Sequence, residues 1–307
     1  MQNNQSFEIE KSNYFLCHVA ANEYEGLWTA SKPTVIITAV INGLSAPVAT
    51  ITNILVLAVV LRTPSIRNPS TILLGCLVLT DFFVGFLVQP MTIFENIYRS
   101  HSCGVRVAGS LLEYTVTCVS FTTITAIAFE KYITLFHPLV CESYVTNRRA
   151  LILSTLIWVF WLLLIPVRVY WSNTFFWSLL GVAWGCGSLT SVIIYAKIFR
   201  LLQHHKRRIR REQQTSDASP IAHTKSAITM GYIIGVLMVC YIPLGAVLLY
   251  QKNAGESKTA LIAEAWSETL FYVTSSLNPI IYCCRNEEMR KAIAVQLKTM
   301  KTSYCCS

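Results

Sequence analysis

Seven long stretches of mainly apolar residues, separated by short polar segments, dominate the chain. They lie near residues 34–61, 69–95, 105–135, 149–171, 174–202, 224–250 and 260–283. A helix needs about 20 mainly apolar residues to cross the hydrocarbon core of a bilayer, and each stretch supplies them. Only helices and closed barrels satisfy their backbone groups in lipid, and these stretches are too long and too uniformly apolar for barrel strands with one polar face. The pattern predicts an all-α membrane protein, a seven-transmembrane helix bundle.

The polar segments divide the chain into one membrane domain and two flanking regions. We predict an N-terminal arm over 1–32, the seven-helix domain over 33–283, and a cytoplasmic helix and tail over 284–307. Basic residues in the last region indicate a short amphipathic helix after the seventh span. Most of the 25 Lys and Arg residues lie on one side of this arrangement. Because cytoplasmic loops carry the excess of basic residues, the N-terminus is predicted to be extracellular.

The amino-acid composition agrees with an integral membrane protein. Hydrophobic residues make up 53% of the chain and charged residues only 13%, which excludes an ordinary soluble domain. The net charge of +9 needs no nucleic-acid partner, because basic cytoplasmic segments facing anionic membrane lipid account for it. The basic run from His204 to Arg211 is predicted to extend the fifth helix beyond the membrane.

Several spans carry polar residues on one helical face. An ionisable residue at the centre of a span costs about 2.5 to 3.5 kcal/mol on insertion scales, so such residues usually face the bundle interior and serve a function. Asp81 is central in the second span and Asn53 in the first. At helical spacing, one face of the third span carries Glu113, Thr117, Ser120 and Lys131, and one face of the seventh carries Glu264, Glu268, Tyr272, Ser275, Asn278 and Tyr282.

These residues predict a polar corridor through the bundle. Polar side chains also hold helices together, at about 0.6 kcal/mol each, and for Asn53 or Ser120 alone that explanation suffices. Oxygen ligands of the kind that Asp81, Ser120, Ser275 and Asn278 offer suit a hard cation, so we expect a site for sodium or a proton there. Pro243 and Pro279 lie beside polar or aromatic residues, where a kink can act as a hinge.

Residues in register on successive spans carry a family resemblance. They are Asn53 and Val56 in the first span, Leu77 and Asp81 in the second, Trp158 in the fourth, Tyr195 in the fifth, Cys240-Tyr241-Ile242-Pro243 in the sixth, and Asn278-Pro279-Ile280-Ile281-Tyr282 in the seventh. Together they resemble the rhodopsin-like (class A) G-protein-coupled receptors. The resemblance implies a plasma-membrane receptor with an extracellular ligand and a heterotrimeric G protein as partner.

The resemblance also implies roles for individual residues. Asp81, Ser120, Ser275 and Asn278 match the pocket in which sodium favours the resting state. The matching switch residues are Glu130, Lys131 and Tyr132 at the base of the third helix, Tyr241 and Pro243 in the sixth, and Tyr195, Pro279 and Tyr282 near the cytoplasmic end. Opening there would admit a helix of the G protein.

The chain departs from the family pattern at several of these positions. Lys131 replaces the usual arginine and lacks its planar fork. His223 stands where many members carry an acidic partner, Tyr241 replaces the usual tryptophan, and Gly187 replaces a proline. The short loop around 171–174 has no cysteine for the usual bridge. We therefore expect reduced or unusual coupling to G proteins; equal second-messenger output from the parent and Lys131→Arg would reject this expectation.

The outer half of the predicted bundle is acidic. The residues expected to contact ligand are Glu95, Glu113, Tyr114, Thr117, Tyr241, Glu268 and Tyr272. Glu113 matches the acidic position with which amine receptors hold an ammonium group, so a small cationic or basic peptide ligand is expected. The alternative is that Glu113 is protonated, or paired internally with Arg106 or Arg168. Tyr272 stands where a retinal pigment needs its lysine, which excludes that class.

The sequence is compatible with two branches of the family. Glu113 and Tyr272 favour an amine-receptor-like assignment. The missing loop cysteine, the short second outer loop and Gly187 resemble the melanocortin receptors instead. A transporter or channel with a polar corridor is the alternative outside the family. No metal cluster or nucleophile constellation indicates an enzyme.

Candidate modifications lie at the two ends of the chain. Asn4 begins a glycosylation triplet on the side predicted to be external. Cys17 and Cys103 are the external cysteines, and either a disulfide between them or two free thiols is compatible with the sequence. Cys305 and Cys306 follow the basic segment near the membrane and are candidates for palmitoylation, with an ordinary cytosolic thiol pair as the alternative.

Overall fold

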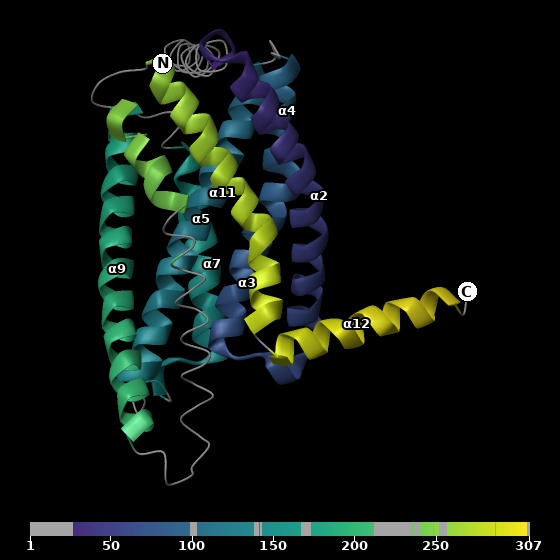
Figure 1. The fold of residues 1–307 in the computed structure, drawn as a ribbon, viewed down its shortest axis with the longest axis vertical. Helices are drawn as coiled ribbons and strands as arrows, with labels where there is room; N and C mark the ends of the chain where they lie inside the picture. Colours follow the sequence, from purple (N-terminus) through teal and green to yellow (C-terminus); the bar gives the residue numbers. More distant parts are fainter. Residues whose placement is uncertain are drawn as a thin grey trace, which may run out of the picture.

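Long helices packed side by side make up the protein (Figure 1). The computed structural model describes residues 27–98, 103–137, 141, 143–166, 173–211, 235, 240–247, 249–251, 257–285 and 287–305. Within these ranges all regular structure is helical, which confirms the predicted fold class.

The helices follow the order of the predicted spans. They are α2 (Lys32–Arg62), α3 (Pro69–Phe83), α4 (Gln89–Tyr98), α5 (Cys103–Phe136), α7 (Asn147–Leu163), α9 (Asn173–Arg211), α11 (Lys258–Arg285) and α12 (Glu287–Cys305), with short turns η1 (Pro64–Ile66) and η2 (Val84–Val88). An apolar helix over Cys240–Gln251 belongs to the sixth predicted span. As predicted, α9 continues through the basic run to Arg211, and α12 leaves the foot of the bundle at a steep angle (Figure 1).

Local sequence sets where several helices begin. Ser31 precedes α2, and its hydroxyl accepts from the backbone N–H of Thr34 at 3.3 Å. At the start of α3 the side chain of Asn68 accepts from the N–H of Thr71 at 2.9 Å. Both helices carry proline in their first turn, where its missing N–H costs no internal bond. These caps satisfy backbone donors at the ends of the spans.

The second span changes its winding at its middle. Helix α3 passes into the π-helical turn η2, and α4 continues to Tyr98. Pro90 follows this turn and cannot donate the backbone bond that a regular helix would require. The turn Val84–Val88 is buried in part by Ala46 and Ala49 of α2, against which Gly85 packs closely. The wider π-helical turn therefore changes the direction in which the side chains of α4 point relative to those of α3.

The packing order places α3 and α5 at the centre. Helix α2 packs against α3 and α11, α3 packs against α5, and α5 packs against both α7 and α9. Large apolar side chains cover the outside of the bundle, among them Leu44, Ile51, Leu163 and Val182. Such a surface is stable in hydrocarbon and not in water. Four of the described helices are long and apolar enough to span a membrane: Lys32–Arg62, Pro69–Ile97, Gly104–Phe136 and Leu179–Leu201.

Candidate functional site: an outer cavity, a central polar cluster and a cytoplasmic lock

A cavity of about 270 Å³ lies between the outer halves of the helices. It is lined by four of the predicted ligand residues, which are Glu113, Tyr114, Thr117 and Glu268. Glu264 joins them from α11, so three carboxyl groups face the same space. Most of the remaining wall is aromatic or aliphatic. The cavity is therefore acidic at one end and apolar elsewhere, a combination that suits a ligand with a cationic group and an apolar body.

Glu113 of α5 is linked across the bundle to α11. The hydroxyl of Tyr272 donates a hydrogen bond to Glu113 Oε1, and the Tyr272 side chain is fully buried. Of the two alternative partners, Arg168 lies outside the described residues, and no contact joins Glu113 to Arg106 within them. This hydrogen bond ties α5 to α11, the two helices that carry five of the seven predicted ligand residues.

Three predicted ligand residues, Glu95, Tyr241 and Tyr272, lie outside the wall of this cavity. Glu95 is only 2% exposed and packs against Gly109, where an added Cβ would stand 3.1 Å from Glu95 Oε1. Tyr241, 2% exposed, lies among other aromatic rings instead of lining the cavity. We therefore expect Glu95 and Tyr241 to support the site from behind.

Aromatic rings form a continuous layer that includes Tyr241. The ring of Tyr241 lies 5.0 Å from Phe271, 5.5 Å from Phe121 and 6.0 Å from Trp184, measured between centroids. Phe271 in turn lies 5.6 Å from Tyr272. The layer thus joins α5, α9, the Cys240–Gln251 helix and α11. Ring pairs at these separations are mutually stabilising.

Two glycines make room for this layer. A Cβ at Gly187 would stand 2.6 Å from Cε1 of Phe121, and a Cβ at Gly245 would stand 2.6 Å from Cζ3 of Trp184. Gly187 is the position at which the family more often carries proline. Here its absent side chain admits the ring of Phe121, a use that the sequence alone did not indicate.

Three of the four predicted cation ligands meet at the centre of the bundle. Ser275 Oγ donates to Asp81 Oδ1 at 2.7 Å, and Asn278 Nδ2 donates to Asp81 Oδ2 at 2.8 Å. The hydroxyl of Ser120 donates instead to Thr80 Oγ1 at 2.6 Å. Thr80 therefore belongs to this polar cluster, although the sequence did not indicate it. All of these side chains are at most 2% exposed.

Asn53 completes this cluster from α2. Its amide Nδ2 donates to the carbonyl oxygens of Ala49 and Ser275, both at 2.8 Å. Its Oδ1 is buried and accepts no hydrogen bond. A buried acceptor without a donor is costly, and a bound water or cation would satisfy it. The donor set therefore fits a hard cation beside Asp81.

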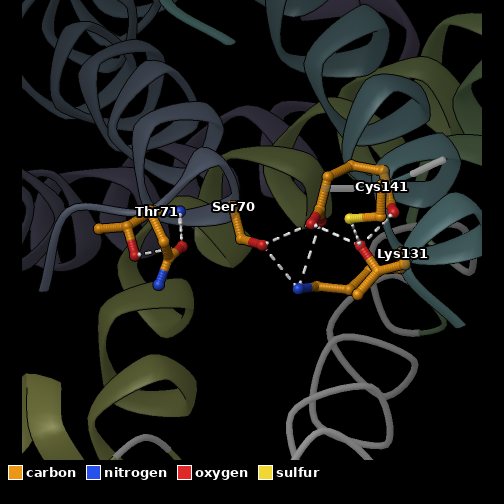
Figure 2. A network of polar contacts seen from close by, with 7 residues as sticks. Ser70, Thr71, Lys131 and Cys141 are labelled. Carbon is orange, nitrogen blue, oxygen red and sulfur yellow. Dashed lines mark hydrogen bonds and ion pairs between the residues drawn. The ribbon is translucent and has the colours of Figure 1, made fainter. Parts of the chain in front are cut away.

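A second polar cluster surrounds the predicted switch at the cytoplasmic end of α5 (Figure 2). The Nζ of Lys131 donates to Ser70 Oγ at 2.7 Å and lies 3.3 Å from Glu130 Oε2. Ser70 Oγ donates to Glu130 Oε1 at 2.8 Å, and Thr134 Oγ1 donates to the same oxygen at 3.2 Å. One hydroxyl of α3 therefore binds both charged residues of α5, and Lys131 and Glu130 are only 7% and 8% exposed.

The remaining switch residues are only partly described. Tyr132 stacks on Phe136 with centroids 4.7 Å apart, and Lys197 Nζ lies 5.5 Å from the Tyr132 ring centre. Among the residues that the structure describes, the buried hydroxyl of Tyr195 finds no hydrogen-bond partner. The side chain of Tyr282 lies outside the described residues, so the expected meeting of Tyr195 with Tyr282 stays a prediction.

A polar network at the outer end of α2 was also missed. Gln89, fully buried, donates to Asn42 Oδ1 at 3.2 Å and to Ser45 Oγ at 2.6 Å, and Asn42 donates to Thr269 Oγ1 at 3.3 Å. The turn η2 directs Gln89 into this contact. A polar residue within the second span, just before Pro90, was the sequence feature that could have indicated this network.

Other predicted sites lie outside the described residues. These are Asn4, Cys17, His223, Cys306 and the side chains of Cys103 and Cys305. The glycosylation, disulfide and palmitoylation predictions, and the external position of the N-terminus, therefore stay predictions.

Comparison with known proteins agrees with this geometry. The profile of the 7 transmembrane receptor (rhodopsin family) matches residues 52–176 and 166–282. The chain therefore belongs to the rhodopsin family of seven-transmembrane receptors. It is a G-protein-coupled receptor of the cell surface and not an enzyme, which confirms the family that the motifs predicted.

The relatives come from more than one branch of the family. The chain is 24% identical to rat (Rattus norvegicus) melanocortin receptor 5 over 273 residues, which cover 84% of this chain and 81% of that protein. It is 27% identical to cannabinoid receptor 1 of Xenopus laevis over 283 residues, covering 78% and 58%. It is 26% identical to rat G-protein coupled receptor 3 over 261 residues, covering 78% and 76%. Similar identities to different receptors leave the branch unassigned.

Proposed function

We propose that this receptor binds an extracellular cationic ligand at Glu113 and signals by opening its cytoplasmic face. The observation that carries the proposal is the position of Glu113, at the acidic end of a cavity whose other walls are mostly apolar. A carboxylate in such a place is costly without a counter-charge. The Tyr272 hydroxyl supplies one hydrogen bond, and a ligand ammonium would supply the charge.

The aromatic layer offers a route from the ligand to the switch. A cation at Glu113 competes with the Tyr272 hydroxyl for the same oxygen, and Tyr272 touches Phe271, which touches Tyr241. Tyr241 lies two residues before Pro243, at the predicted hinge of the sixth span. Movement of this hinge would open the cytoplasmic end, where the Ser70–Glu130–Lys131 contacts hold α3 to α5.

We further propose a sodium ion beside Asp81 in the resting state. Asp81, Ser275 and Asn278 would hold it, with Asn53 Oδ1 as the additional oxygen and Ser120 turning from Thr80. The ion would favour the resting arrangement by balancing the Asp81 carboxylate.

A binding screen tests the role of Glu113. Cells expressing the parent and Glu113→Gln at equal surface density are screened with small amines and basic peptides. We expect ligands of the parent to lose at least tenfold in affinity in the variant, because a charge-assisted contact is worth about 1.5 to 3 kcal/mol. Glu287→Gln, the same change in the helix α12, is the control. Undiminished binding of a cationic ligand by Glu113→Gln would reject the role of this residue.

A further inference from the structure

The outer cavity extends well below the carboxyl groups. Its wall on α5 runs from Glu113 through Phe121 to Thr125. At a rise of about 1.5 Å per residue this is about 18 Å along the helix axis. A small amine that filled only the acidic end would leave most of this length without a ligand.

The deep part of the cavity is apolar in effect. Thr122 donates to the carbonyl of Cys118 at 2.8 Å and accepts from Trp161 Nε1 at 2.9 Å, and Thr125 donates to the carbonyl of Phe121 at 3.1 Å. Because these hydroxyls already form hydrogen bonds within the protein, a ligand in this part of the cavity does not need polar groups to pair with them. The other deep wall residues are Phe160, Leu180, Ala183, Trp184 and Gly187. This part suits a hydrocarbon chain.

The same part of the cavity opens towards the bilayer. Helices α7 and α9 both pack against α5, but in the described part of the chain they scarcely touch each other. Phe160 of α7 lines the cavity and is 54% exposed, and Ala183 of α9 lines it and is also exposed. Their neighbours Leu163 and Val182 are exposed on the outer surface. An opening between α7 and α9, lined by these exposed side chains, would put the cavity in contact with membrane hydrocarbon.

We propose that the ligand is a cationic amphiphile, with its ammonium group at Glu113 and an apolar chain in the cleft between α5, α7 and α9. The chain enters from the bilayer through the opening between α7 and α9. This inference rests on the proposed function for the position of the charge, and adds the chemical class of the ligand. A cavity that runs about 18 Å along α5, with charge at one end only and an apolar deep part, matches a chain-bearing amine better than a polar peptide.

A homologous series of primary n-alkylammonium ions is the probe. Binding to the purified receptor in lipid nanodiscs is measured for each chain length, with n-alkanols of the same lengths as neutral controls. Burial of one methylene is worth about 0.8 kcal/mol, so affinity rises about fourfold per methylene until the cleft is filled, and then levels off. The alkanols correct for simple partition into the lipid and bind at least tenfold more weakly.

A pair of variants locates the chain. Ala183→Phe fills the cleft from α9, and we expect it to abolish the rise with chain length while short amines bind as in the parent. Val182→Phe makes the same change at the adjacent position, which is 65% exposed and does not line the cavity, and retains the rise. Retained binding of short amines shows that Ala183→Phe is folded.

The outcomes separate this inference from the proposed function. No dependence on chain length in the parent overturns the inference. Equal dependence in Ala183→Phe and the parent also overturns it, because the chain then lies elsewhere. If amines and alkanols bind equally and Glu113→Gln changes neither, while Ala183→Phe still abolishes the rise with chain length, the apolar cleft is retained and the cationic ligand, and with it the proposed function, fails.

Discussion

At the scale of single residues, glycines and buried hydroxyls decide how this bundle closes. Gly187 and Gly245 provide space for Phe121 and Trp184, because a Cβ at either position would stand 2.6 Å from a ring atom and force a shift. Sequence reasoning recognised Gly187 as a departure from the family pattern but could not say what filled the space. That information depends on the packing of α5 against α9, which no local pattern encodes.

Gly187→Ala is expected to destabilise the receptor. Its Cβ would stand 2.6 Å from Cε1 of Phe121, a ring held by Trp184 and Tyr241, so the cost is about 1 to 3 kcal/mol. Gly185→Ala is the matched control, because a Cβ there meets no atom within 4 Å, and alanine favours a helix by about 0.5 to 1 kcal/mol. Thermal unfolding of the purified proteins measures both changes. A melting temperature for Gly187→Ala at or above that of Gly185→Ala would contradict the packing described.

Asp81→Asn is expected to abolish the effect of sodium. In the parent, replacing potassium by sodium at constant ionic strength should raise the melting temperature and reduce the potency of an activating ligand, because the ion stabilises the resting state. The variant loses the charge that holds the ion, so the two salts should act alike on it. Thr80→Val, at the hydroxyl to which Ser120 donates, leaves Asp81 intact and is expected to keep the sodium response. A sodium response unchanged in Asp81→Asn would reject the site.

At the scale of helices, Ser70 ties α3 to α5 at the cytoplasmic end, and we expect this contact to restrain the switch. Ser70 of α3 bonds to Glu130 and to Lys131, which are adjacent on α5. The sequence marked Glu130 and Lys131 through their motif, yet it gave no sign of Ser70, whose hydroxyl lies 60 residues earlier in the chain than Glu130. An arginine at this position would present a planar guanidinium with several N–H donors. Lys131 has a single ammonium group, which donates to the Ser70 hydroxyl.

Ser70→Ala is expected to raise signalling without ligand. Hydrogen bonds to charged groups are worth about 1.5 to 3 kcal/mol, so their loss should shift the balance towards the open state about tenfold or more. A G-protein reporter in cells with matched surface expression measures the basal activity. Ser70→Thr retains the hydroxyl and should behave as the parent. Equal basal activity of Ser70→Ala and the parent would show that this contact does not restrain the switch.

At the scale of the whole molecule, the fold could be predicted and the site only in part. Long apolar spans in a single chain allow few structures, so the number and order of the helices followed from hydrophobicity. Asp81, Ser275 and Asn278 meet as expected because helical spacing puts the last two on one face of α11. The partner of Ser120 and the shape of the cavity were not predictable, since they depend on how each helix is rotated about its own axis. The π turn at Val84–Val88 is one such rotation.

In the proposed mechanism, a cation bound at Glu113 opens the cytoplasmic face to a G protein. Guanine-nucleotide exchange by a purified heterotrimeric G protein, added to the receptor in nanodiscs with and without an activating cation from the binding screen, measures this most directly. We expect the cation to accelerate exchange with the parent and with Glu287→Gln, and to have no effect with Glu113→Gln at the same concentration. Equal acceleration by the parent and Glu113→Gln, or no acceleration by any cation that binds the parent, would contradict the account.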